Sequence, residues 1–493
     1  MMQIGARAGE AAARRPGRGA GAAYVAVLAA GYVAVLMANL PGHLTFDSLL
    51  ELYEGRYRVR QSWAPSFYAW VLGVFDRIWS GTGLYVIASG LLLLVALASF
   101  VGLRRGRASR WAVVLTALFC ASPMLLIYQG IVWKDVLFAN AAVAGMTALA
   151  WAVRGPQSTG RRGAALTIAL VLLAAAALLR QNGVIVAVAA AAAMGWIMAE
   201  RRWRRGLAWG LGSLAAVVAV SHAMDLATRP QQAPAAGQER RLGPGDGMAE
   251  GLRILRAYDI QGVVAADPKV ALPAVTASDP AAAKVIRQLA PRYYSAQRTG
   301  ITDGQPQLHQ AVLSISDAAL ASDWRDIILR RPGLYLRQRL AVFGWVFLTP
   351  NIDRCLPVAL GIQGPDEVMD ELGIDGRWSA VDERLLRYDR AFLRTPAHSH
   401  PVYALLALAV GLLLLRRREP ADIVMAALMA AALAFAASFF LISIACDFRY
   451  LYFLDLAAMA GAIYVALDPP WRSPRGRRAS GAVGHATDRR RND

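Results

Sequence analysis

The sequence predicts an all-α polytopic membrane protein with about ten transmembrane helices. Of the 493 residues, 56% are hydrophobic and only 18% are charged. Apolar runs of about 18 to 22 residues, the length that crosses a bilayer as a helix, recur along the chain. The arginines fall in short clusters between these runs, so the net charge of +19 reflects membrane topology. No soluble basic domain points to a nucleic-acid partner.

The predicted spans are the apolar runs themselves, at 21–40, 82–103, 111–130, 135–153, 163–180, 183–199, 206–224, 400–415, 421–443 and 449–467. Arginine clusters occupy alternate junctions, and these are Arg7/Arg14/Arg15/Arg18, Arg104/Arg105/Arg107/Arg110, Arg154/Arg161/Arg162, Arg201/Arg202/Arg204/Arg205 and Arg416/Arg417/Arg418. The positive-inside rule places all of these clusters on the cytoplasmic side of the membrane. We expect this to be the cell (inner or plasma) membrane. The basic segments 1–20 and 468–493 are then cytoplasmic too, which requires an even number of spans.

Two shorter apolar segments, 63–79 and 335–350, are rich in aromatic residues and interrupted by charge. Counting either one alone as a span would place an arginine cluster on the wrong side of the membrane. We therefore expect both to be helices that lie on the outer leaflet, with two further spans as the alternative.

This topology leaves two long regions outside the membrane. The first is the loop 41–81 within a transmembrane module at 21–224. The second, 225–399, begins with a linker rich in Pro, Gly and Gln and continues with helical patterns, one of which starts at Pro332. We expect it to form a small helical extracytoplasmic domain ahead of the C-terminal spans at 400–467.

Polar residues gather at the outer ends of the predicted spans, in short links where lipid exposure of a charge would be costly. They belong to TFDS, IVWKDVLFA, LLRQNGV and DFRYLYF, and they are Asp47, Lys134, Asp135, Arg180, Gln181, Asn182, Asp447, Arg449 and Tyr450. Arg180 and Arg449 lie on the outer side against the positive-inside trend. The set predicts an interfacial pocket with carboxylates and cations.

Such a pocket suits group transfer from a phosphate-linked lipid. Lys134, Arg180 and Arg449 could bind a phosphate or diphosphate, the arginines through paired hydrogen bonds. A carboxylate could deprotonate an acceptor hydroxyl, or it could hold a divalent metal ion that neutralises the leaving phosphate.

With its early Asp47, outer loop and motifs QSWAPSFYAWVLG, IVWKDVLFA, LLRQNGV and DFRYLYF, the chain resembles a bacterial branch of the C-type (GT-C) polyprenyl-phosphate-dependent glycosyltransferases. The resemblance is best up to about residue 224. It implies a GT-C-like bundle, Asp47 as general base or metal-site acid, and a sugar carried on an undecaprenyl-type phosphate. The chain departs from the pattern in two places: Ser48 follows Asp47 where relatives pair two acids, and Ala64-Pro65 stands where they often have His-Pro.

Structural explanations stay open for several of these residues. Asp47 could cap the helix SLLELYEGRY, and Lys134 with Asp135 could be a solvated pair at the start of a span. Arg180 and Arg449 could be snorkelling anchors, and Asp447 could simply pair with Arg449. His309, His398 and His400 are expected at the surface. A Cys355–Cys446 disulfide is allowed by compartment but not indicated by spacing.

The sequence thus predicts a membrane glycosyltransferase that moves a sugar from a polyprenyl-phosphate donor to a glycan, lipid or protein acceptor in the envelope. Asp47 is the expected base and Asp135 a supporting acid. Lys134, Arg180 and Arg449 are expected to bind the donor phosphate, with Gln181, Asn182 and Tyr450 in support, and magnesium or manganese is the candidate cofactor. The alternatives are a polysaccharide polymerase or ligase, and a transporter or flippase of lipid-linked substrates, although repeat symmetry typical of transporters is missing from the sequence.

Overall fold

The computed structural model describes residues 18–60, 62, 65–106, 108–155, 157–230, 246–297 and 305–469. Every regular element in these ranges is a helix, and extended residues pair only in three isolated bridges. The predicted all-α fold is therefore confirmed. Outside the described residues lie Arg7, Arg14, Arg15, Arg107, Ala64, most of the linker after residue 230, and the basic tail from residue 470.

Nine helices of the described residues are long and apolar enough to cross a membrane, which confirms a multi-pass membrane protein. They are α1 (Arg18–Asn39), α4 (Gly83–Leu103), α7 (Lys134–Val153), α8 (Thr159–Leu179), α9 (Val184–Ala199), α10 (Trp203–Thr228), α19 (His400–Arg417), α20 (Pro420–Ile442) and α21 (Tyr452–Leu467). Two of these spans include a 3₁₀ turn: η2 (Gln181–Gly183) continues into α9 to give the span Gln181–Ala199, and η5 (Phe448–Leu451) continues into α21 to give the span Phe448–Leu467.

The predicted span 111–130 is not one straight helix. It consists of α5 (Arg110–Ala121), α6 (Pro123–Leu126) and η1 (Tyr128–Gly130), with a bend of 67° between α5 and the pair α6–η1. The break falls at Ser122, whose backbone is extended because the following Pro123 disfavours a helical conformation there. Counted as one broken span, this pair gives the predicted total of ten.

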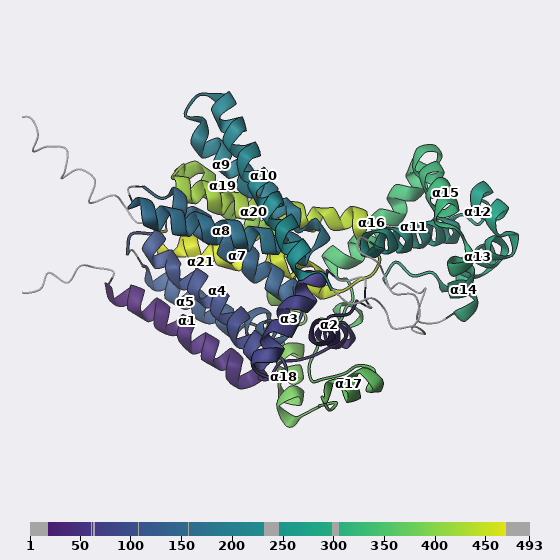
Figure 1. Cartoon of the computed structure of the whole chain (residues 1–493), viewed down its shortest axis with the longest axis horizontal. Coiled ribbons are helices and arrows are strands. Elements are labelled where there is room, and N and C mark those ends of the chain that lie inside the picture. The colour runs from purple at the N-terminus through teal and green to yellow at the C-terminus, as the bar shows by residue number, and fades with distance from the viewer. Residues whose placement is uncertain are drawn as a thin grey trace, which may run out of the picture.

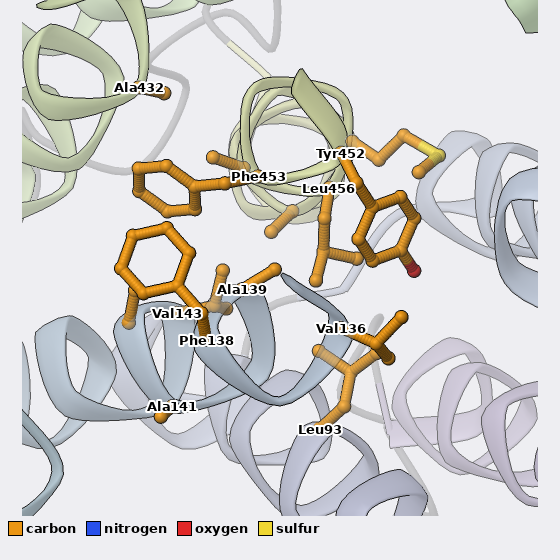
Figure 2. Packing of buried hydrophobic residues seen from close by; sticks show 14 of the residues in the cluster. Leu93, Val136, Phe138, Ala139, Ala141, Val143, Ala432, Tyr452, Phe453 and Leu456 are labelled. Atoms are coloured by element: carbon orange, nitrogen blue, oxygen red, sulfur yellow. The ribbon is translucent and has the colours of Figure 1, made fainter. Parts of the chain in front are cut away.

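The two most deeply buried spans, α7 and α21, form the centre of the bundle. Figure 2 shows Phe138 and Val143 of α7 pointing toward Phe453 and Leu456 of α21. The Phe138 ring packs against Phe453 with their centroids 5.0 Å apart. Because a buried helix has no lipid-facing stripe, these two spans are apolar on all sides.

Two amphipathic helices, α2 (Phe46–Tyr57) and α3 (Ser66–Ile78), follow α1. They lie at the end of the bundle where α1 ends and α7 begins, which we call the site end. At about 1.5 Å per residue, the 13 residues of α3 and the 17 residues of α16 (Pro332–Leu348) fall short of the roughly 30 Å hydrocarbon core. α3 is too short to span, and α16 is not among the helices that are long and apolar enough to cross a membrane. The position of both on the membrane surface stays a prediction.

The described residues of the region 225–399 fold as two separate parts. The helices α11 (Asp246–Ala266), α12 (Pro273–Ser278), α13 (Pro280–Tyr293), α14 (Pro306–Ser314) and α15 (Asp317–Arg330) form a lobe with its own apolar core. The later segment, with η3 (Ile352–Arg354), α17 (Asp366–Leu372), α18 (Ala380–Arg390) and η4 (Pro396–His398), contributes Val358, Leu360 and Ile362 to the core of the bundle. Figure 1 shows the lobe and the helices α17 and α18 on different sides of α2 and α3.

The described arginine clusters lie at the end of the bundle opposite the site end, because successive spans alternate in direction. Arg104 illustrates the packing there: its guanidinium contacts Asp422 and Asp468, each at 2.8 Å. The arginine clusters and the alternating direction of the spans thus place the same span ends on one side of the bundle.

The crossing of α2 and α3 depends on two glycines, and this generates a stability prediction. A Cβ added to Gly73 would lie 2.2 Å from the carbonyl oxygen of Gly55. Gly73→Ala should therefore separate the helices and cost about 1–3 kcal/mol, measured as a lowered Tm in detergent. The matched control is Gly212→Ala in α10, where a Cβ meets nothing within 4 Å. An equal Tm for the two variants would contradict the close crossing.

Candidate active site

Of the nine polar residues that the sequence placed in the pocket, all but Asp447 line one cavity of about 210 Å³ at the site end of the bundle. They come from four separate links or helix starts, and they are Asp47, Lys134, Asp135, Arg180, Gln181, Asn182, Arg449 and Tyr450. The structure thus brings the predicted residues together, whereas their chemical roles remain predictions.

Arg449 is the central cation of this cavity. Its guanidinium contacts the carboxylate of Asp47 at 2.6 Å and that of Asp447 at 2.7 Å. It also lies 4.8 Å above the ring of Trp133, a cation–π contact. With only 14% of its side chain exposed and two carboxylates bound, Arg449 is not a snorkelling anchor.

Asp47 does not cap α2. The N-cap residue is Thr45, whose hydroxyl lies 3.1 Å from that of Ser48 and accepts a hydrogen bond from the Trp133 indole at 3.1 Å. Asp47 sits in the first helical turn, where the helix dipole favours a carboxylate. Its side chain is 43% exposed, so it is open to a ligand in the cavity.

The other two cations are paired with more deeply buried acids. Lys134 Nζ contacts Glu51 Oε1 at 2.7 Å, and Arg180 contacts Asp135 Oδ1. Asp135 starts α7 with its side chain 4% exposed, so Lys134 and Asp135 are not a solvated pair. Among the described residues, the second oxygen of Asp135, Oδ2, has no hydrogen-bond partner.

Aromatic rings fix the direction of Arg180. Its guanidinium lies 5.5 Å from the ring of Phe439 and 5.5 Å from that of Tyr450, and these two rings stack on each other. The neighbouring Asn182 donates a hydrogen bond to Ser438 at 2.8 Å, while Gln181 is exposed at the rim. The tight link between α8 and α9 is therefore held against α20.

The acids of the site differ in charge. Burial acts to raise the pKa of Asp47, but the nearby cations Arg449 and Lys134 hold this pKa below its ordinary value. Burial outweighs the attraction of Lys134 at Glu51 and raises its pKa to about 7. Burial likewise raises the pKa of Asp447 to about 6 against the effect of Arg449. Of Asp47, Glu51 and Asp447, Asp47 is thus the one that is most firmly ionised at neutral pH.

The residues do not form an evident metal site. Asp47 and Asp135 each hold a guanidinium, and no group of three or more His, Cys, Asp or Glu side chains within the described ranges has a metal-binding arrangement. This donor set does not fit the magnesium or manganese ion, which stays a prediction from the resemblance.

Sequence reasoning missed the apolar wall of the cavity. Leu252, Ile254 and Leu255 come from α11 of the lobe, and Ile442 and Ile444 come from the end of α20 and the link after it. The lobe helix carried the signal GLRILRAYD, but only the tertiary packing reveals which of its residues meet the bundle. Glu51 was also left out, because one acid in an amphipathic helix looks like a solvated residue.

The expectation that His398 and His400 lie at the surface is wrong. Both are buried, because the segment before α19 folds over the ring of Phe448. His398 lies 2.9 Å from Asp389, and His400 lies 3.0 Å from Asp455. The polar partners make this burial tolerable. The question left open for Cys355 and Cys446 is settled in favour of a disulfide.

No protein-family model matches the chain. No curated protein matches its sequence. Among solved structures, it is similar to an oligosaccharyltransferase from Archaeoglobus fulgidus, with 13% identity and a TM-score of 0.41 over 89% of this chain and 48% of that one. It is also similar to ArnT from Cupriavidus metallidurans bound to undecaprenyl phosphate, with 15% identity and a TM-score of 0.35 over 90% of this chain and 77% of that one.

The chain thus spans about half the length of the oligosaccharyltransferase that it matches. Both matches have TM-scores below 0.5. At such TM-scores and identities they carry no argument about activity, which has to come from the residues of the cavity.

The raised pKa of Glu51 generates a prediction about pH. Because this pKa is about 7 in the folded protein and 4.5 ordinarily, the folded state binds the extra proton between these values. Stability due to this group is therefore present at low pH and is lost as the pH rises through this window. The difference in Tm between wild type and Glu51→Gln should thus change in favour of wild type from about pH 8 to about pH 5.

The matched control for this measurement is Glu367→Gln, which changes an exposed glutamate in the first turn of α17. Its Tm should follow that of the wild type at every pH. A Glu51→Gln variant that also follows the wild type would show that Glu51 is ionised throughout.

Proposed function

We propose that this protein is a membrane glycosyltransferase that moves a sugar from a polyprenyl-phosphate donor to a hydroxyl of a cell-envelope acceptor. The observation that carries the proposal is the cavity in which three cations converge beside the partly exposed carboxylate of Asp47. The motifs that resemble the C-type glycosyltransferases supply the residues of this cavity, which supports the same conclusion.

The three cations suit a phosphate. Lys134, Arg180 and Arg449 come from three different links, and all three line the same cavity. Guanidinium groups bind phosphate oxygens in pairs, and the ammonium group adds a compact charge. In the free protein each of these cations is paired with a carboxylate. This pairing holds the cationic side chain at the cavity before the donor binds.

The apolar wall suits the lipid part of the donor. Leu252, Leu255 and Ile442 lie in the same cavity as the cations, so a phosphate bound there would have its polyprenyl chain beside aliphatic side chains. Burial of such a chain contributes roughly 25 cal/mol per Å² of apolar surface removed from water. Cationic and aliphatic walls in one cavity therefore match an amphipathic lipid phosphate.

The proposed step is an inverting displacement at the anomeric carbon. The acceptor oxygen attacks that carbon and gives its proton to Asp47, while the bond from the carbon to the phosphate oxygen breaks. The electron pair of this bond leaves with the polyprenyl phosphate, and the three cations stabilise its charge. Asp135 orients Arg180 from the buried side of the cavity, through its oxygen Oδ1.

We further propose that the cavity opens to the outer face of the inner or plasma membrane. Two features at opposite ends of the bundle support this: the arginine clusters favour the cytoplasm for the far end, and the Cys355–Cys446 disulfide favours an oxidising compartment for the site end. The donor sugar and the acceptor glycan, lipid or protein are the partners of this face.

The other two functions have less support. A transporter moves its substrate through charged sites near the middle of the membrane, whereas the charged cavity here lies at one end of the bundle. A polysaccharide polymerase or ligase would use the same lipid-linked chemistry and would differ only in its acceptor.

Asp47→Asn tests the chemical step. The amide keeps the shape of the side chain but cannot accept the acceptor proton, so release of polyprenyl phosphate from a panel of lipid-phosphate sugars, with crude envelope acceptors, should fall by roughly 100- to 10,000-fold. Binding of undecaprenyl phosphate should be retained. The matched control, Asp366→Asn on the exposed start of α17, should turn over as wild type. Turnover equal to that of wild type in Asp47→Asn would show that Asp47 takes no part in the reaction.

Arg180→Ala tests the phosphate site. Loss of one charged hydrogen-bonding group should weaken binding of undecaprenyl phosphate by roughly 10- to 100-fold while membrane insertion is retained. Arg330→Ala, at an exposed arginine paired with Asp326 on α15, is the control and should bind as wild type. Unchanged affinity in Arg180→Ala would exclude Arg180 from the site.

A further inference from the structure

The link between α20 and α21, residues 443–447, carries Arg449 into the cavity but has no helical structure of its own. Its polar contacts come largely from segments outside the bundle. Arg339 of α16 donates to the carbonyl of Ser443, and the Cys446 amide donates to the carbonyl of Gln297 at 2.7 Å. The adjacent Phe448 amide donates to the carbonyl of Cys355 at 2.8 Å.

A disulfide joins this link to the segment after α16. Cys446 is bonded to Cys355, 91 residues away in sequence, and both residues are buried. The segment that contains Cys355 is itself attached to the bundle, because Tyr128 donates to the carbonyl of Pro357 at 2.6 Å. The disulfide therefore connects the Arg449 link to a fixed part of the protein.

The same segment also reaches the start of α2. The carbonyl of Gly361 accepts from the Leu44 amide at 2.9 Å, and the Gln363 amide donates to the carbonyl of Leu44 at 3.1 Å. Asp47 is three residues beyond Leu44, and Arg449 is three residues beyond Cys446. The disulfide thus lies on a continuous path between the two partners of the ion pair.

We propose that the Cys355–Cys446 disulfide is a positioning element that holds Arg449 where it binds the donor phosphate. This inference rests on the proposed function, because it concerns the same phosphate site. Without the cross-link, residues 443–447 gain conformational freedom and Arg449 is held in place for a smaller fraction of the time. Phosphate affinity then falls in proportion to the fraction that is correctly placed.

The disulfide also makes phosphate binding dependent on the redox state. Dithiothreitol reduces the bond to two thiols and is itself oxidised to a cyclic disulfide, so no other reactant is needed. In a reducing compartment the site would have low affinity, and in an oxidising one high affinity.

The test measures the affinity of purified full-length protein for undecaprenyl phosphate. Cys355→Ala/Cys446→Ala should bind about tenfold more weakly than wild type. Cys120→Ala, which removes the free cysteine in α5, is the matched control and should bind as wild type. Wild type reduced with dithiothreitol should bind as weakly as the double variant, and a count of its free thiols checks that the bond is broken. If the double variant does not fold, the result with reduced wild type decides the test.

A second experiment, in the Arg449→Ala protein, distinguishes a disulfide that positions Arg449 from one that only stabilises the fold. If the disulfide acts through Arg449, its removal in an Arg449→Ala protein should weaken phosphate binding by less than about twofold, because coupled effects are not additive. A further tenfold loss in that background, or unchanged affinity after reduction of wild type, would overturn the inference. Failure of wild type itself to bind any polyprenyl phosphate would instead overturn the proposed function.

Discussion

The ion pair between Arg449 and Asp47 joins parts of the chain that are 402 residues apart, at the place where three links between spans meet. Arg449 approaches from the last link, and Asp47 from the first surface helix. Trp133, just before α7, lies under the guanidinium and binds Thr45 at the start of α2. Contacts around the guanidinium of Arg449 therefore hold three parts of the protein together: α2, the N-terminus of α7 and the final link.

This arrangement follows from the cost of charge in an apolar protein. A buried cation that loses its partner destabilises a protein by about 3–5 kcal/mol, so each cation of the cavity is held by a carboxylate. The same pairing keeps the cations at the cavity, where the proposed donor phosphate would exchange with a carboxylate. The acids whose pKa is raised, Glu51 and Asp447, can take up protons when that exchange occurs.

Much of the fold and the site could be predicted because the membrane restricts where polar residues occur. Apolar length located the spans, and polar residues in short links on the side opposite the arginine clusters located eight of the residues that line the cavity. The bend before Pro123 was also encoded locally, because a residue before proline favours an extended backbone.

Other features depend on contacts that leave no local pattern. Nothing in the sequence around Leu252 indicates that α11 meets the bundle, and nothing in the spacing of the cysteines indicates their pairing. The burial of His398 and His400 depends on aspartates from α18 and α21. The division of region 225–399 into two parts likewise arises from packing of Val358 and Leu360 against the bundle.

The most direct test of the phosphate site is a cryo-electron microscopy structure of the protein with bound undecaprenyl phosphate. The account predicts phosphate oxygens within about 3.2 Å of Lys134 Nζ and of the guanidinium nitrogens of Arg180 and Arg449, with the lipid chain along Leu252 and Ile442. A phosphate bound elsewhere, with the three cations still on their carboxylates, would contradict it.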